Sequence, residues 1–298
     1  MSLFNEIAME SNKIGIGNTP LFKIGETGIY SKLEYYNRFR SIKDRAAFFM
    51  IDYALKSGEL RSDQTIIEAS SGNTGIAIAG ISSILNLKNE IVIPESAPDA
   101  TKKLLSSFGS RVVTTPGNST ENSINYVEDM IEKYPEKYYR LSQHANIMNS
   151  NAHYYGTGPE INEKLEHIDN LVVGVGTGGT ITGLARYFKE KYNINVTGVL
   201  PAEGSRIVGL RNPFKSNHRV LLDTYKSLID NFVTVSEDDA YEGVRQLKAK
   251  YNLLVGPSSG ANYMASLAIS ENKGTTVTVF PDDYYKYQSI YIEKSIID

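Results

Sequence analysis

An α/β fold with mostly parallel sheets is predicted for this chain of 298 residues. Short apolar runs alternate from end to end with stretches of helical length, which is typical of strands covered by helices on both faces of a sheet. Several of these runs end in a turn rich in glycine or serine that leads into the next helix. The length allows one large domain or two medium domains.

The first half of the chain is predicted to alternate strands with helices. One helix begins at Lys43 and runs to Leu55 through a stretch rich in Ala and Phe. Continuous apolar runs bounded by turn residues predict the strands, and longer apolar segments predict the helices. The strands are expected at 65–68, 90–94 and 111–115, and the other helices at 76–85, 99–108 and 121–133.

The second half repeats this order. A largely apolar strand at 170–175 leads into a glycine-rich turn and a helix at 181–192. The less regular stretch 140–158 is expected to contain a junction between domains. Further strands are expected at 196–200, 232–235 and 275–280.

The composition excludes several classes of protein and site. Lys and Arg total 31 and Asp and Glu total 34, so no basic excess supports nucleic-acid binding. The absence of Cys excludes disulfides, Cys-ligated zinc and thiol nucleophiles, and the four His residues lack metal-ligand spacing. No apolar run has the length of a membrane span, and the N-terminus does not resemble a signal peptide. We therefore expect a cytoplasmic protein without a membrane partner or a bound metal ion.

Lys43 is the first candidate for chemistry. It begins an apolar helix two residues before Arg45. A helix N-terminus and a nearby guanidinium both disfavour the charged ammonium and lower its pKa, as a Schiff-base lysine requires. A solvated lysine beside Asp44 as the N-cap is the alternative interpretation.

Two serine-containing turns between a strand and a helix are candidate binding loops. The loop 70–75 offers hydroxyl groups, an amide and the free N–H groups of a helix start, which together suit a carboxylate or a phosphate. The turn 256–261 offers a serine hydroxyl that suits a ring nitrogen of a ligand. In each case the alternative is an ordinary turn whose serine caps the helix.

The turn 174–180, Gly-Val-Gly-Thr-Gly-Gly-Thr, is the strongest candidate for a phosphate site. Its glycines allow the backbone to approach a ligand closely, and the following helix start supplies N–H donors. Gly174, Gly176 and Gly179 also satisfy the G-x-G-x-x-G pattern, and Glu203 follows the next strand, as in dinucleotide-binding folds. Taken by itself, this turn favours a nicotinamide or flavin cofactor.

Other polar positions carry weaker signals. Asp282 and Asp283 follow the last predicted strand, at the edge of the sheet where ligands bind in α/β folds, but a solvated turn also explains them. His144 and His153 favour a polar loop. The sequence contains neither a Gly-x-Ser-x-Gly nucleophile elbow nor a Walker A motif.

Short motifs follow one another along the chain in a fixed order. They are Asn18-Thr19-Pro20-Leu21, Lys32-Leu33-Glu34, Ser41-Ile42-Lys43-Asp44-Arg45, the loop 68–75, His153-Tyr154, Thr157-Gly158-Pro159-Glu160-Ile161, the turn 176–180, Pro201-Ala202-Glu203-Gly204-Ser205, the turn 256–260 and Phe280-Pro281-Asp282. In this order they resemble the pyridoxal-phosphate enzymes of fold type II, the tryptophan-synthase-β-like family, and within it the branch of cysteine synthase and cystathionine β-synthase. The resemblance implies two doubly wound domains, a smaller mobile one at 40–147 and a larger one made of 1–39 and 148–298.

The resemblance also assigns roles to individual residues. Lys43 matches the lysine that binds pyridoxal 5'-phosphate and removes the substrate α proton, Asn73 the partner of the cofactor 3-hydroxyl, and Ser258 the partner of the pyridine nitrogen. The phosphate would be held by Gly176, Thr177, Gly178, Gly179 and Thr180. The substrate carboxylate would be held by Ser70, Ser71, Gly72, Asn73, Thr74 and Gln143.

The implied reaction is a β-replacement of the cysteine synthase type. An amino acid such as O-acetylserine or O-phosphoserine loses its leaving group through an aminoacrylate, and sulfide adds to give L-cysteine. The smaller domain would close over the substrate and exclude water. Enzymes of this family are usually homodimers, and the resemblance implies the same here.

Three departures from the family pattern bear on specificity. Residues 37–41 read Asn-Arg-Phe-Arg-Ser, where the family has Asn-Pro-Gly-Gly-Ser. The segment 216–230 contains no glycine, although the family carries a glycine-rich segment near the substrate at this point. Arg211 lies near the position at which relatives that use O-phosphoserine carry an arginine, and a guanidinium suits a phosphate leaving group. A surface arginine is the alternative for Arg211.

Other functions stay open at this point. Within the family, a cystathionine β-synthase-like enzyme would use serine or O-phosphoserine with homocysteine, and another β-substituted alanine synthase would use another nucleophile. A nicotinamide-dependent oxidoreductase would account for the turn 174–179 and Glu203 but would leave Lys43, Asn73 and Ser258 unexplained. A catalytically silent binding protein is favoured only by the altered segment 37–41.

Overall fold

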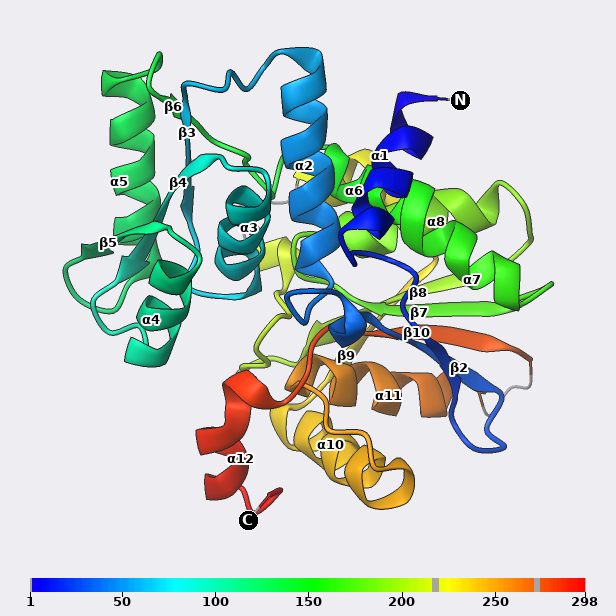
Figure 1. Cartoon of the computed structure of the whole chain (residues 1–298). Helices are drawn as coiled ribbons and strands as arrows, with labels where there is room; N and C mark the ends of the chain where they lie inside the picture. The colour runs from blue at the N-terminus through cyan, green and yellow to red at the C-terminus, as the bar shows by residue number, and fades with distance from the viewer. Residues whose placement is uncertain (1, 216–219, 271–273, 298) are drawn as a thin grey trace.

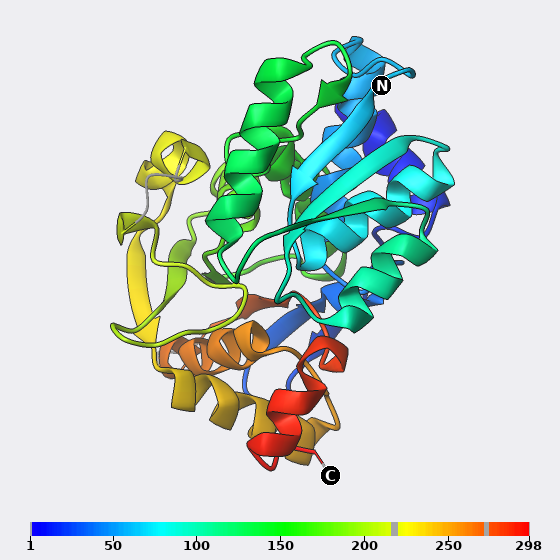
Figure 2. The same cartoon turned by 90° about the vertical axis from the view of Figure 1, so that its left-hand side faces the viewer.

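The computed structural model describes residues 2–215, 220–270 and 274–297, which form two lobes, each built on one sheet (Figures 1 and 2). One sheet has six strands in the order β1-β2-β10-β7-β8-β9, and the other has four in the order β5-β4-β3-β6. Most neighbouring strands are parallel. The predicted α/β class with mostly parallel sheets is confirmed.

The four-stranded sheet is parallel throughout. Its strands are β3 (Thr65–Ala69), β4 (Lys88–Pro94), β5 (Arg111–Thr115) and β6 (Tyr138–Tyr139), and its helices are α2 (Lys43–Ser57), α3 (Asn73–Ile84), α4 (Asp99–Ser107) and α5 (Thr120–Lys133). Successive side chains of a strand point to opposite faces of its sheet. Accordingly, Ile66 packs with α2, α3 and α4 on one face, and Ile67 packs with α5 on the other.

The six-stranded sheet carries helices on both faces. Its strands are β1 (Leu21–Lys23), β2 (Ile29–Leu33), β7 (Asn170–Gly174), β8 (Asn195–Pro201), β9 (Asn231–Val235) and β10 (Thr276–Phe280). The helices α7 (Gly158–Lys164) and α8 (Gly179–Lys189) cover one face, and α10 (Glu237–Tyr251) and α11 (Pro257–Ser270) cover the other. A short helix, α6 (Met148–Ala152), contacts both α2 and α8 and so joins the two lobes.

Several elements escaped prediction from the sequence. The hairpin of β1 and β2 is antiparallel, and its first strand has only three residues, too few for a clear period. Most of the other elements that were not predicted are short, but the helix α10 has 15 residues and also lacked a predicted counterpart. Besides α10 they are α1 (Leu3–Lys13), η1 (Glu34–Tyr36), β6, α6, the π-helical turn η2 (His153–Thr157), α7, η3 (Pro213–Lys215), α9 (Val220–Tyr225), η4 (Lys226–Leu228), η5 (Tyr285–Tyr287) and α12 (Gln288–Glu293). Of the glycine-free segment 216–230, residues 216–219 lie outside the described residues.

Three segments that are distant in sequence meet just beyond β10. The backbone N–H of Ile42 donates to the carbonyl of Pro281 at 2.8 Å, and that of Gly256 donates to the carbonyl of Asp282 at 3.0 Å. These two hydrogen bonds place the starts of α2 and α11 on either side of the carboxyl end of β10. Ligands of α/β folds bind at such carboxyl ends.

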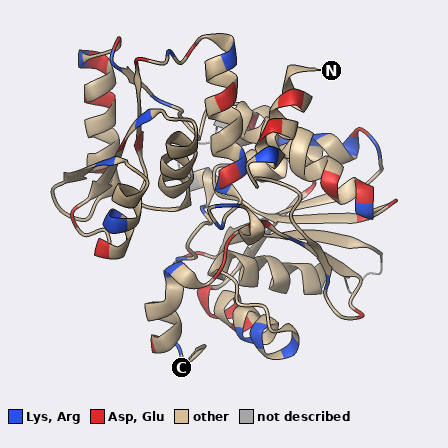
Figure 3. Ribbon diagram, in the orientation of Figure 1, with Lys and Arg blue, Asp and Glu red and all other residues tan. Residues whose placement is uncertain are grey.

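Charged residues of both signs lie close together on the helices of both lobes (Figure 3). Within the described ranges, no helix combines the length and apolar character needed to cross a membrane. The same ranges contain no cluster of three His, Cys, Asp or Glu side chains that could hold a metal ion.

Candidate active site

A pocket lies where the starts of α2, α3, α8 and α11 approach the carboxyl ends of β7 and β10. It is lined by Ile42, Lys43, Asn73, Val173, Gly174, Gly176, Thr177, Gly178, Thr180, Gly209, Leu210, Ser258, Asn262, Val279, Pro281 and Asp282. The structure thus brings together the lysine, the glycine-rich turn and one residue from each serine-containing turn. Four helix starts around one pocket favour a ligand that carries negative charge.

Lys43 is the first residue of α2, and its half-buried side chain lines this pocket. Burial lowers the pKa of Lys43 to about 8, the Asp282 carboxylate raises it, and the Arg211 guanidinium lowers it. The guanidinium that lowers the pKa of Lys43 is therefore that of Arg211, whereas the sequence predicted this effect for Arg45. The cap residue of α2 is Ile42, and the Asp44 carboxylate accepts a hydrogen bond from the Phe39 N–H at 2.6 Å. The interpretation of Lys43 as a solvated lysine beside an Asp N-cap is wrong.

The glycine-rich turn is folded tightly against its surroundings. Gly178 has a φ of 90°, a left-handed conformation that favours glycine, and it caps the start of α8. A Cβ atom on Gly176 would lie 2.7 Å from the carbonyl oxygen of Gly209. On Gly179 it would lie 2.1 Å from the side-chain oxygen of Asn149. Larger residues at these two positions would therefore clash with Gly209 and Asn149 and distort the turn.

Two buried side chains hold the hydroxyl groups of this turn. Asn149 donates from Nδ2 to the Thr177 hydroxyl at 3.0 Å. The Nε2 atom of His153 lies 3.2 Å from the Thr180 hydroxyl, and its Nδ1 atom lies 2.9 Å from that of Thr157. Burial lowers the pKa of His153 to about 3, so the ring stays neutral. The expectation of a polar loop at His153 is wrong, because His153 is buried in the helical turn η2 and contacts the hydroxyls of Thr157 and Thr180. The spacing of apolar residues in the sequence does not reveal such contacts.

Asn73 is the first residue of α3, and its side chain crosses from the four-stranded lobe to the segment after β10. Its Nδ2 atom donates to Oδ2 of Asp282 at 2.7 Å. Asp282 and Asp283 are both buried, so the interpretation of this pair as a solvated turn is wrong. The position directly after the last strand was the signal that pointed to Asp282 in the sequence.

Ser258 and Asn262 lie one turn apart on α11 and both line the pocket. Ser258 is the second residue of the helix rather than the residue before it, so the interpretation of Ser258 as an N-cap is wrong. Asn262 donates from Nδ2 to the carbonyl of Val279 at 2.8 Å. Its Oδ1 atom is buried and has no hydrogen-bond partner within the described residues.

The rest of the loop 70–75 lies beside the pocket rather than in its lining. The Ser70 hydroxyl accepts a hydrogen bond from the Gly75 N–H at 3.1 Å and thereby supports the start of α3. Thr74 donates from its hydroxyl to Oε1 of Gln143 at 2.8 Å, which brings together two residues that the resemblance assigned to the substrate carboxylate. Ser71 and Gly72 complete the loop, and Gly72 is exposed.

Arg211 lies in a second hollow that adjoins the pocket at Leu210. Its side chain is exposed, and its Nη1 atom lies 3.5 Å from Nε2 of His144. Glu203, the residue expected to bind a ribose, lies in this second hollow rather than beside the glycine-rich turn. The guanidinium is close enough to act on the charge of Lys43, although it does not line the same pocket.

The segment that departs from the family pattern is integrated into the fold by its new side chains. Arg40 adopts a φ of 67°, at a position where the family has glycine. Its Nε atom forms an ion pair with Asp283, and its guanidinium carbon lies 4.4 Å from the centre of the Tyr285 ring. Phe39 packs edge-on against Phe108 of the four-stranded lobe, with ring centres 5.5 Å apart.

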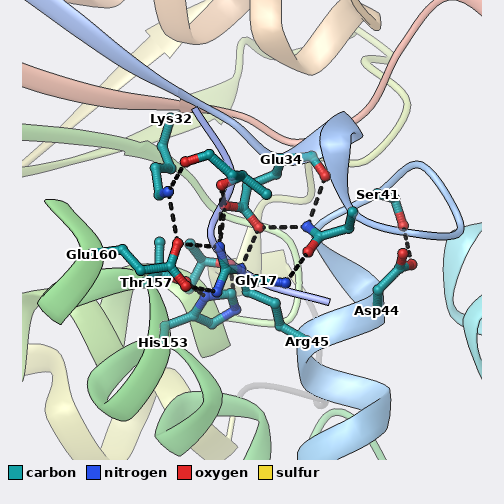
Figure 4. A network of polar contacts seen from close by, with 12 residues as sticks. Gly17, Lys32, Glu34, Ser41, Asp44, Arg45, His153, Thr157 and Glu160 are labelled. Atoms are coloured by element: carbon teal, nitrogen blue, oxygen red, sulfur yellow. Dashed lines mark hydrogen bonds and ion pairs between the residues drawn. The ribbon is translucent and has the colours of Figure 1, made fainter. Parts of the chain in front are cut away.

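A network of charged side chains surrounds Arg45 on α2 (Figure 4). Arg45 donates to Glu34 at 2.6 Å from Nε and to Glu160 at 2.6 and 2.7 Å from its two terminal nitrogens. Lys32 forms an ion pair with Glu160 at 2.7 Å, and Thr19 donates to Glu34 at 2.7 Å. These residues join β2, α2 and α7, so the network fixes the start of α2 relative to the six-stranded lobe.

Comparison with known proteins gives consistent matches along nearly the whole chain. The family model described as "Pyridoxal-phosphate dependent enzyme" matches residues 13–282. A cysteine synthase of Aquifex aeolicus is 38% identical over 291 residues, which cover 91% of this chain and 88% of that protein.

Solved structures are similar as well. A hydrogen sulfide-producing enzyme of Fusobacterium nucleatum superposes with a TM-score of 0.84 at 36% identity, covering 92% of this chain and 96% of the other. A cysteine synthase of Entamoeba histolytica superposes with a TM-score of 0.86 at 30% identity, covering 99% of this chain and 91% of the other.

Proposed function

The chain belongs to the family of pyridoxal-phosphate dependent enzymes, in its cysteine synthase branch, and we propose that the pocket around Lys43 is its active site. It is an enzyme of cysteine synthase-type β-replacement, so the interpretations as a nicotinamide-dependent oxidoreductase and as a silent binding protein are wrong. One observation carries the assignment of the site. Lys43, Asn73, four residues of the turn 176–180 (Gly179 is not among them) and Ser258 are far apart in the sequence but line one pocket.

The pocket fits pyridoxal phosphate. The N–H groups at the start of α8 and the hydroxyls of Thr177 and Thr180 suit its phosphate. The Oδ1 atoms of Asn73 and Asn262 are buried and have no hydrogen-bond partner within the described chain, as expected of groups that a bound ring would satisfy. When bound, the cofactor supplies an electron sink that stabilises negative charge at the substrate α carbon.

The loop 70–74 and Gln143 are proposed to hold the substrate carboxylate. The loop lies at the start of α3, where N–H groups and the helix dipole favour an anion. The hydrogen bond between Thr74 and Gln143 ties this loop to the chain that follows β6. We propose that residues 40–147 close over a substrate whose carboxylate is bound here.

Lys43 is proposed to carry the proton of the reaction. With a pKa lowered to about 8 by burial, its amine both accepts and releases a proton near neutral pH. No hydrogen bond or ion pair holds its Nζ atom within the described residues, so the side chain is free to reach a substrate. It would remove the α proton, after which the β substituent leaves and the nucleophile adds.

The donor is proposed to be O-acetylserine or O-phosphoserine, with sulfide as the nucleophile. Arg211 decides between the two donors in this proposal, because its guanidinium is exposed beside the pocket and suits a phosphate leaving group. Serine as the donor and homocysteine as the nucleophile, as in a cystathionine β-synthase-like enzyme, form the alternative within the family.

The test measures L-cysteine formed by the cofactor-loaded protein from sulfide and each donor, together with the visible absorption of the cofactor. We expect turnover with O-acetylserine or O-phosphoserine and none with Lys43→Ala. If O-phosphoserine is used, Arg211→Gln should lower its kcat/KM about tenfold or more, and Arg206→Gln in the same exposed hollow should not. A colourless protein that pyridoxal phosphate cannot reconstitute would contradict the proposal.

Release of hydrogen sulfide is a second candidate activity. It is favoured by the similarity over 92% of the chain to a hydrogen sulfide-producing enzyme. Supplying L-cysteine with and without a second thiol, and measuring released sulfide, separates this direction from cysteine synthesis. A sulfide release much faster than cysteine formation would reverse the assigned direction.

We also propose that the enzyme is a homodimer and works in the cytoplasm. The homodimer is carried over from the resemblance to the family, and light scattering of the purified protein tests it. A monomer at working concentration would contradict this assembly.

A further inference from the structure

Asp282 is a buried acid that lines the pocket but has no role in the proposed reaction. It follows β10 after Pro281, is only 3% exposed and lines the pocket beside Lys43. Its backbone pairs with Ser41 ahead of α2 and with Gly256 ahead of α11. Its position is therefore fixed by backbone contacts on two sides, independently of its carboxylate.

The carboxylate joins elements from both lobes. Its Oδ2 atom accepts hydrogen bonds from Nδ2 of Asn73 and from the Tyr287 hydroxyl, each at 2.7 Å. Its Oδ1 atom lies over Gly256, where a Cβ atom would approach it to 2.1 Å. One carboxylate thus touches the start of α3 and the residue that precedes α11. Both helix starts favour a negative charge at this point.

Burying a carboxylate costs free energy unless it is paired or hydrogen-bonded. Burial raises the pKa of Asp282, the charge of Lys286 and the hydrogen bonds from Tyr287 and Asn73 oppose that rise, and Asp283 adds to it. The Asp282 carboxylate in turn raises the pKa of Lys43. An apolar residue of similar size would avoid the desolvation cost but would leave Asn73 without its acceptor.

The contact with Asp282 also fixes the orientation of Asn73. With its amide nitrogen on Asp282, the amide group cannot rotate freely. The Oδ1 atom of Asn73 then remains unpaired within the described chain, in a residue that lines the pocket. Without Asp282, several orientations of this amide would compete.

We propose that Asp282 is a positioning residue, which orients Asn73 against the cofactor and holds the starts of α3 and α11 together. The inference rests on the proposed role of Asn73 at the cofactor ring. It predicts that Asp282 acts through Asn73, so the two side chains should be energetically coupled.

A double-mutant cycle tests this coupling. Asp282→Ala, Asn73→Ala and the double variant are loaded with pyridoxal phosphate, and the cofactor dissociation constant and the pH titration of its absorption band are measured. We expect Asp282→Ala to weaken cofactor binding about tenfold in the wild-type background and less than about threefold in the Asn73→Ala background. Asp282→Asn, which keeps an acceptor oxygen, should recover part of the loss.

Tyr287→Phe is the matched control, because it removes the other hydrogen bond to the same oxygen and leaves Asn73 untouched. We expect it to change cofactor binding less than about threefold. Equal effects of Asp282→Ala in both backgrounds, or an unchanged dissociation constant, would overturn the inference. A wild-type protein that binds no pyridoxal phosphate would instead overturn the proposed function.

Discussion

Lys43 and Arg45 lie two residues apart at the start of α2, yet they belong to regions of opposite character. Lys43 faces a pocket in which the Oδ1 atoms of Asn73 and Asn262 have no hydrogen-bond partner within the described residues. Arg45 enters a network in which all three of its nitrogens donate to oxygens. We infer that the paired charges around Arg45 contribute to the stability of the fold, because removing one partner would leave a buried charge uncompensated. The unpaired polar atoms around Lys43 are instead available to bind a ligand.

The largest effect on activity is expected for substitution of Lys43, which faces the pocket. Lys43→Ala should lower kcat by about a thousandfold or more and abolish covalent attachment of the cofactor. Folding should be retained, because no ion pair is lost and burial already disfavours the charged amine. Borohydride reduction followed by mass spectrometry, together with thermal unfolding, measures both. A variant that still fixes the cofactor at another lysine would show that Lys43 is misassigned.

In this network, Arg45→Met should lower the free energy of unfolding by about 3–5 kcal/mol. It removes the ion-pair partner of the buried Glu34 and leaves Glu160 with Lys32 alone. Denaturant titration gives the free energy of unfolding. Arg61→Met is the control, since the ion pairs of Arg61 are exposed and should contribute about 1 kcal/mol or less. A loss at Arg45 no larger than that at Arg61 would mean that the network does not hold the fold.

The pH dependence of stability tests the charge of Glu160 in the network around Arg45. Despite its burial, the charges of Arg45 and Lys32 lower the pKa of Glu160 to about 2. A lowered carboxyl pKa stabilises the folded chain above the unfolded value of 4.5, and this contribution is lost as the pH falls through about 2. Unfolding free energies measured between these pH values should therefore fall with acid in the wild type and fall less steeply in Glu160→Gln. Equal slopes would contradict the assigned charge state.

The smallest effect is expected at Arg40, whose side chain is 54% exposed. Arg40→Ala loses the ion pair with Asp283 and the contact with Tyr285 but keeps the left-handed backbone. Arg40→Gly loses the same contacts and relieves the backbone strain, so it should be the more stable of the two by about 1 kcal/mol. Thermal unfolding of the pair measures this difference. If the alanine variant is the more stable, strain at residue 40 is negligible.

Much of the fold was predictable because its signals are local. The apolar run at 171–175 and the run rich in β-branched residues at 275–280 predict strands wherever they stand in the chain. The glycines of the turn 174–180 mark a tight turn by themselves. The short hairpin of β1 and β2 lacks such a signal, since β1 has only three residues and β2 pairs with the distant strand β10. The motifs around Lys43, at 70–75 and at 256–260, and their order along the chain, were likewise visible in the sequence.

The sequence by itself determined which side chains are available: a lysine at a helix start, hydroxyls and amides in turns, and a glycine-rich phosphate turn. Only the tertiary structure decided which of them meet. Successive residues of a helix are turned by about 100°, so Lys43 and Arg45 point in nearly opposite directions, and what lies in each direction depends on the rest of the chain. The roles of His153 and Asp282 arise in the same way, because their partners Thr180 and Asn73 come from distant segments. Such contacts depend on packing between distant elements, which no local pattern encodes.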